Sequence, residues 1–120
     1  MATVSAVEQS VRDDRMSRVA SLVWTPLTSA NAIGDSKSLV GSRDRSVQFA
    51  GTWDSATIVL QGSNDGTNWH TLNDPLGTDI SATANALFQI LECTRYIRPS
   101  GSGGGGSSSV TVTVFCSGDR

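Results

Sequence analysis

The chain has 120 residues and a net charge of −2, with 38% apolar and 17% charged residues, which suits one globular domain with one core. This charge balance gives no reason to expect nucleic acid as a partner, because nucleic-acid binding normally appears as a clustered basic excess. No stretch is long and apolar enough to cross a membrane, and the first ten residues lack the pattern of a secretory signal. We therefore expect synthesis in the cytoplasm and no membrane partner.

Residues 1–20 differ in pattern from the rest of the chain and are predicted to form an N-terminal arm. Val4, Val7 and Val11 follow an i, i+3, i+7 spacing, and arginines recur every third residue from Arg12 to Arg18. Because β-branched valine is a mediocre helix former and the stripe is narrow, an isolated helix here would be marginal. We expect the arm to become ordered on a partner or to lie as an extended strand, with a frayed terminus as the alternative.

The rest of the chain, residues 21–120, is predicted to be one β-sandwich domain. Its first half contains two predicted strands separated by a long connection. Residues 19–28 form the first strand, with Leu22 and Trp24 on one face, until Pro26 marks an edge or a strand end. Residues 29–46 are small and polar and are predicted to be a surface loop, with a strand fragment at 38–40. Residues 46–53 alternate so that Phe49 and Trp53 point into the core.

A hairpin is predicted at residues 57–72, because alternating apolar residues are followed by Ser-Asn-Asp-Gly, which tolerates a tight reversal. A second loop at 73–85 and a strand at 86–92 follow. The Gly/Ser-rich residues 99–109 are predicted to be a mobile tip, and Val110, Val112 and Val114 alternate with polar residues in the last strand. Together these patterns predict an all-β fold, an antiparallel β-sandwich that is jelly-roll-like or immunoglobulin-like, with an extended N-terminal arm.

Residues with catalytic chemistry are scarce, and we predict no enzyme, no cofactor and no metal site. His70 is the only histidine, which excludes a histidine-based metal cluster within one chain. Oxygens of Asn64, Asp65 and Asn68 could in principle bind calcium, but turn geometry explains these residues better. The two cysteines, Cys93 and Cys116, are expected to be reduced and mostly buried, although a bridge between them stays open.

Tryptophans on a sheet can bind sugars or fill the core, and the sequence predicts different positions for Trp53 and Trp24. Trp53 is predicted to point inward, whereas Trp24, beside Pro26, is the candidate for an exposed interface aromatic. Arg98 is expected to pair with Asp54 or Asp44 across the sheet, or to meet a neighbouring subunit.

The phrases LQGSNDGTNW and TRYIRP, followed by a Gly/Ser loop and an alternating Val/Thr strand, carry a family resemblance over residues 47–115. They resemble small β-sandwich proteins that decorate or cement the heads of tailed bacteriophages. The resemblance implies a structural virion protein, made in the host cytoplasm, that sits on the outer capsid surface and bridges adjacent major capsid protein subunits. It also implies a homo-oligomer, with a trimer favoured over a dimer.

Similar phrasing occurs in discoidin-like and other carbohydrate-binding sandwiches. The alternative function is therefore a glycan-binding or adhesion module of a phage head fibre or tail. For contact with the capsid or with another subunit, the predicted residues lie in the arm, the first strand and the polar loop at 30–45, whereas glycan binding would need an exposed aromatic such as Trp24. The predicted contact residues are Val4, Val7, Val11, Arg12, Arg15, Met16, Arg18, Trp24, Arg43 and Arg45.

Overall fold

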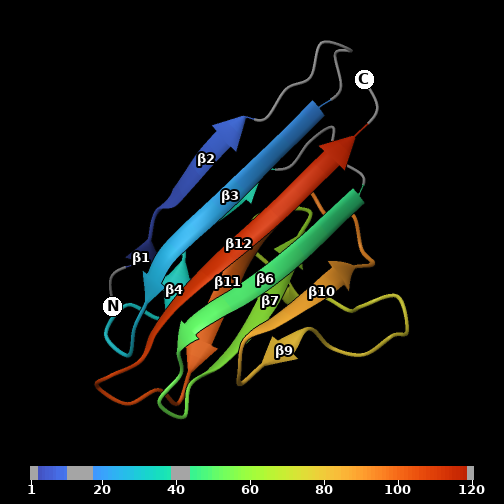
Figure 1. The fold of residues 1–120 in the computed structure, drawn as a ribbon. Helices are drawn as coiled ribbons and strands as arrows, with labels where there is room; N and C mark the ends of the chain where they lie inside the picture. The colour runs from blue at the N-terminus through green and yellow to red at the C-terminus, as the bar shows by residue number, and fades with distance from the viewer. Residues whose placement is uncertain (1–2, 11–17, 39–43, 119–120) are drawn as a thin grey trace.

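The computed structural model describes residues 3–10, 18–38 and 44–118, which form two facing β-sheets and contain no helix (Figure 1). The predicted contact residues Val11, Arg12, Arg15, Met16 and Arg43 lie outside these ranges. Without a helix, the described part of the chain also has no helix that could span a membrane. The predicted all-β sandwich is confirmed.

Sheet B lies in front in Figure 1 and has the strand order β10-β6-β12-β3-β2. All of its neighbouring strands are antiparallel. Its strands are β2 (Ala6–Ser10), β3 (Arg18–Leu27), β6 (Asp44–Thr52), β10 (Ala86–Ile90) and β12 (Ser109–Gly118).

Sheet A lies behind sheet B and has the order β1-β4-β11-β7-β8, with β5 also on β11 and β9 also on β7. Its pairs are antiparallel except for β1 with β4. Its strands are β1 (Thr3–Val4), β4 (Ile33–Gly34), β5 (Lys37–Ser38), β7 (Thr57–Ser63), β8 (His70–Thr71), β9 (Ser81–Ala82) and β11 (Tyr96–Ser102).

The core lies between the sheets because alternate side chains of each strand point inward. Phe49 of β6 is fully buried and packs edge-on against Phe88, with ring centroids 6.0 Å apart. Trp53 is half-buried and packs against the same core, 6.2 Å from the ring of Phe49. Other inward positions are Leu22 and Trp24 of β3, Val47 of β6, Ile58 and Leu60 of β7, Ile97 of β11, and Val110, Val112 and Val114 of β12.

Pro26 interrupts the ladder as the sequence predicted, although β3 itself continues to Leu27. The ladder adapts around it: the β3–β12 register shifts between Val110 and Val112. The residues of β3 that pair with β2 end at Trp24. Proline has no N–H, and Pro26 therefore costs no hydrogen bond to β2.

The Gly/Ser tip is shorter than predicted, because β11 extends to Ser102. Asp54 holds the tip: its carbonyl accepts a hydrogen bond from the Gly105 amide at 2.9 Å, and its carboxylate accepts one from the Ser107 amide at 3.0 Å. The second predicted loop contains the short strand β9 and an isolated bridge between Asn73 and Asp79.

The N-terminal segment joins both sheets. Residues 3–4 pair with β4 in sheet A, and residues 6–10 then pair with β3 in sheet B. Residues 3–10 are therefore extended strands within the sandwich, while the domain boundary at residue 20 stays a prediction.

Candidate interaction surfaces

The two outer faces of the sandwich offer the main surfaces for a partner, and they differ in chemistry. We call the outward side chains of sheet B face B, and those of β7, β8 and β11 in sheet A, together with Arg95 and Trp69, face A. Among the described residues, no group of three or more His, Cys, Asp or Glu side chains could hold a metal ion.

Face B is almost uncharged. One row across the sheet, fixed by the strand register, reads Val7, Val23, Thr113, Gln48, Leu87. Leu87 is 69% exposed and Val7 55% exposed. Apart from Asp44 at the start of β6, the described side chains of this face carry no charge.

Phe115 adds an aromatic ring to face B. It lies opposite Ser21 on one side and Ser46 on the other, and it is 45% exposed. A shallow groove lined by Ser46, Leu87, Gln89 and Phe115, among others, runs beside it. The sequence carried a signal for this ring, because Phe115 alternates with the buried valines of β12 and must point the other way.

Face A carries a cation stacked on an aromatic ring. The Arg98 guanidinium lies 4.3 Å from the centre of the Trp69 ring, and its Nε donates a hydrogen bond to Gln61 Oε1 at 2.9 Å. Gln61 and Arg98 are register partners in β7 and β11, which places them side by side. Partial burial lowers the pKa of the Arg98 guanidinium, although an arginine stays charged at neutral pH. The expected pairing of Arg98 with Asp54 or Asp44 is wrong.

A second cation lies in the bend just before β11. The Arg95 guanidinium lies 5.1 Å from the centre of the Tyr96 ring, and the Arg95 amide donates to Asn64 Oδ1 at 3.0 Å. The Tyr96 ring also packs beside Gly66, whose φ of 78° is the left-handed value that the turn requires. The hairpin is thus fastened to β11 at its tip.

Asp65 organises the hairpin turn, as the sequence predicted. Its Oδ1 accepts hydrogen bonds from the Thr67 and Asn68 amides, each at 2.8 Å, and from the Ser63 hydroxyl at 2.8 Å. Its Oδ2 accepts from Asn68 Nδ2 at 2.7 Å. The Asn68 and Thr67 amides, then the two side-chain donors, hold the pKa of the Asp65 carboxyl well below its usual range. Both of its oxygens therefore serve the turn.

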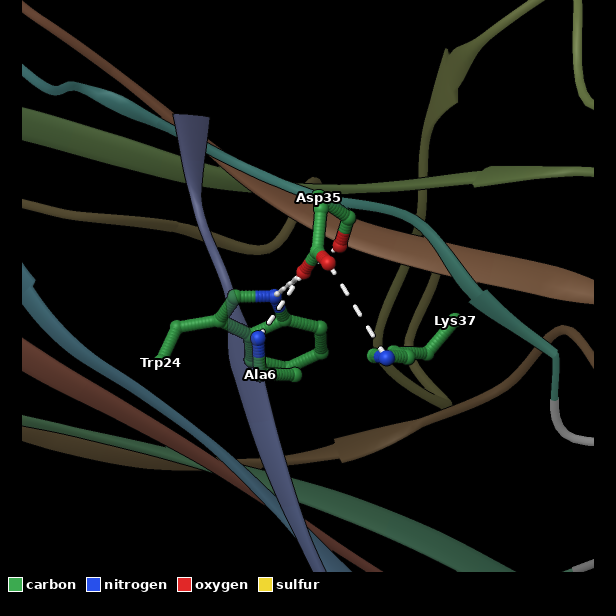
Figure 2. Close-up of polar contacts among 4 residues, drawn as sticks. All are labelled: Ala6, Trp24, Asp35 and Lys37. Atoms are coloured by element: carbon green, nitrogen blue, oxygen red, sulfur yellow. Dashed lines mark hydrogen bonds and ion pairs between the residues drawn. The ribbon is translucent and has the colours of Figure 1, made fainter. Parts of the chain in front are cut away.

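The expectation of an exposed aromatic at Trp24 is wrong. Trp24 is 0% exposed, because strand alternation points it toward sheet A, where Gly34 of β4 lies close to its ring. Its indole Nε1 donates to the Asp35 carbonyl at 2.9 Å and to Asp35 Oδ1 at 3.2 Å. Figure 2 shows the same carboxylate accepting from the Ala6 amide at 2.9 Å and facing Lys37, with Nζ 3.9 Å from Oδ2. Asp35 thus ties the N-terminal segment to the core.

Other predicted contact residues are placed unevenly. Arg45 is 4% exposed, on the inward side of β6 between Cys116 and Ile90, so the expectation that it contacts a partner from the surface is wrong. Val7 lies on face B, Val4 is half-buried beside the core, and Arg18 begins β3.

The cysteines are not joined by a disulfide. Cys116 is buried as expected, whereas Cys93 is exposed.

No family model and no curated protein matches the chain. Among solved structures, the SPBc2 prophage-derived protein YomS has a similar fold, with a TM-score of 0.64 and 13% sequence identity. The match covers 89% of this chain and 99% of YomS. The tailspike protein 4 enzymatically active domain of bacteriophage CBA120 aligns with a TM-score of 0.24 and 10% identity, over 100% of this chain and 16% of that one, which is too loose to support an argument. The YomS likeness shows a shared fold.

Proposed function

We propose that this chain is a non-enzymatic structural protein of a bacteriophage particle that attaches to the outer capsid surface through face B and bridges subunits of the major capsid protein. The observation that carries the proposal is the uncharged outer face of a five-stranded sheet with Val7, Leu87 and Phe115 exposed on it. The fold shared with a prophage-derived protein and the hairpin motifs that resemble phage decoration proteins support the same assignment.

The chemistry of face B suits a protein interface. The centres of protein interfaces are depleted in charged residues and enriched in aromatic ones, because a charge that loses its water without a partner is costly. Face B has one described charge, Asp44, at its margin. Strands about 4.8 Å apart and residues about 3.4 Å apart make the face roughly 20 by 30 Å, or about 600 Å², somewhat less than the ~800 Å² that one partner buries in a standard interface.

Self-association is part of the proposal, with a trimer favoured. Strand β10 ends sheet B, and its sequence ALFQI contains no charge and no proline. Natural proteins usually protect such edges with lysine, proline or a bulge, so an unprotected edge is suited to pairing with another chain.

The test is sedimentation of the purified chain with phage particles that lack it. The double variant Leu87→Asp and Phe115→Asp places two charges on face B, at positions exposed enough to leave the core intact. We expect the variant to stay folded and to lose attachment by at least about tenfold, because two carboxylates must then be desolvated on docking.

The matched control is Thr71→Asp with Ser100→Asp, which adds the same charge to sheet A instead. Attachment should persist in this control. Equal loss in both variants would indicate general charge repulsion, and full attachment of the face B variant would exclude face B as the docking surface. Light scattering of the unmodified chain in solution tests the trimer.

A further inference from the structure

Face A carries a built cationic site that attachment to a particle does not explain. Arg98 lies over the Trp69 ring and is anchored through Nε to Gln61, while Arg95 lies over Tyr96. Tyr96 and Arg98 project from the same side of β11, two residues apart. We call Gln61, Trp69, Arg95, Tyr96 and Arg98 the arginine platform.

The platform's charge is not neutralised within the described part of the chain. Neither Arg95 nor Arg98 lies within 4.0 Å of a carboxylate there, whereas Lys37 has Asp35. The carboxylate of the adjacent hairpin, Asp65, is already committed to four donors of its own turn. Arg98 donates a hydrogen bond to Gln61 through Nε, and its Nη groups make no hydrogen bond to a described residue. Two positive groups therefore face outward with donors to spare.

The geometry of Arg98 favours an anion with two oxygens. A guanidinium offers paired N–H groups in a fixed fork that matches a carboxylate. Here the indole and Gln61 hold that fork in one orientation before any ligand arrives, which lowers the entropy cost of binding. The indole face is covered by the guanidinium, so the platform presents charge and ring edges to a ligand.

The surroundings favour a sugar polymer over a protein segment. Outward neighbours on the same sheet include the hydroxyl groups of Thr71 and Ser100, with half-buried Val59 opposite Ser100. The large apolar side chains that are exposed in the described chain lie outside face A: Val7, Leu76, Leu87, Leu91 and Phe115. The aromatic rings of face A, Trp69 and Tyr96, lie beneath the guanidinium groups of Arg98 and Arg95, so the platform presents cationic and polar groups outward rather than an apolar centre.

We propose that the arginine platform binds an acidic polysaccharide, with Arg98 and Arg95 pairing to carboxylates of uronic or sialic acid residues along an extended chain. Arg95 lies in the bend just before β11 and Arg98 lies within the strand, three residues further on, so their Cα atoms are at most about 11 Å apart and successive acidic sugars can reach both. The net charge of −2 does not oppose this, because local charge decides contact at one face. Faces A and B are opposite sides of the sandwich. If the proposed attachment through face B holds, the platform faces away from the particle.

Binding is tested by calorimetry with oligogalacturonate and with a sialic acid polymer at low salt. The matched neutral probe is methyl-esterified oligogalacturonate, which keeps the sugar rings and removes the charge. We expect the unmodified chain to bind at least one acidic probe and to bind the ester at least about tenfold more weakly.

Variants assign the site. Arg98→Ala should weaken binding by about tenfold or more, and Arg98→Lys should do so to a smaller extent, because lysine keeps the charge but loses the fork. Lys37→Ala removes the same charge from a residue paired with Asp35 and should change affinity by no more than about twofold. Thermal unfolding of each variant confirms that it is folded.

Several outcomes would overturn the proposal. These are no binding to either acidic probe, equal binding to the ester, or equal loss in Lys37→Ala. Tighter binding of poly-glutamate or of a DNA oligonucleotide would assign the platform to a different class of partner. The face B double variant should bind saccharide normally, so failure here and failure of capsid attachment are separate results.

Discussion

Trp24 and Asp35 are hydrogen-bonded at the N-terminal edge of the sandwich, and the hairpin also contains a tryptophan and an aspartate, Trp69 and Asp65. The two pairs play different structural roles. At the edge, Asp35 accepts hydrogen bonds from Trp24 and from the Ala6 amide, 11 and 29 residues away along the chain. At the hairpin, the partners of Asp65 lie two or three residues away. The first aspartate connects distant segments, whereas the second shapes one turn.

The tryptophans follow the same division. Trp24 is fully buried between the sheets, whereas Trp69 is half-buried on the outside and carries Arg98 on its ring. The edge therefore contributes to the stability of the whole fold, and the hairpin prepares a surface. If this comparison is correct, equivalent substitutions at the two places should have unequal effects.

The largest expected effect is on the free energy of unfolding of Trp24→Ala. We expect a loss of about 3–5 kcal/mol, because the substitution leaves a cavity in the core and removes the indole donor to Asp35. Trp69→Ala should cost about 1 kcal/mol, the scale of a partly exposed cation–π contact. Denaturant unfolding of both variants measures the difference.

Trp69→Ala is the control for Trp24→Ala, because both substitutions remove the same side chain. Equal destabilisation by the two substitutions would show that the hairpin also supports the core, and the division between the two regions would then fail.

The hairpin was predictable because its determinants lie within six residues. Ser63 and Asp65 supply side-chain acceptors for the amides of the turn and Gly66 supplies its positive φ, and each is read directly from the sequence. Strand alternation likewise gave the inward positions of Phe49 and of the valines of β12, since burial there follows period two.

The edge was not predictable in the same way. Alternation placed Leu22 and Trp24 on one face, but nothing in the local sequence showed that sheet A would cover that face or that Asp35 would reach the indole. Pro26 suggested an exposed edge, and the bulge that accommodates it depends on the register with β12. The arginine platform depends in the same way on register, because Gln61 and Arg98 become neighbours only when β7 and β11 pair.

An intermediate effect is expected for Asp35→Ala. It removes the acceptor of both the Ala6 amide and one indole bond, at a cost of about 2 kcal/mol. Hydrogen exchange at the amides of β2 should accelerate more than exchange in β6, because the loss falls on the N-terminal edge.

Asp35→Asn separates the two contributions of this carboxylate. The amide oxygen can still accept from Ala6 and Trp24, while the ion pair with Lys37 is lost, and an exposed pair of this kind contributes less than about 1 kcal/mol. Uniform acceleration of exchange across both sheets in the alanine variant would contradict a local role for Asp35.

The smallest effect is expected at Asp65, where it should depend on pH. The pKa of this carboxyl is lowered in the folded state, so its contribution to stability is present above the unfolded value near 4 and is lost as the pH falls below it. Thermal midpoints of the unmodified chain and of Asp65→Asn should differ at neutral pH and converge in acid, since protonation removes the charge that the variant lacks. Asp35→Asn provides the comparison under the same conditions. A difference that widens in acid would mean that the turn does not favour the charged carboxylate, and the local role assigned to Asp65 would be wrong.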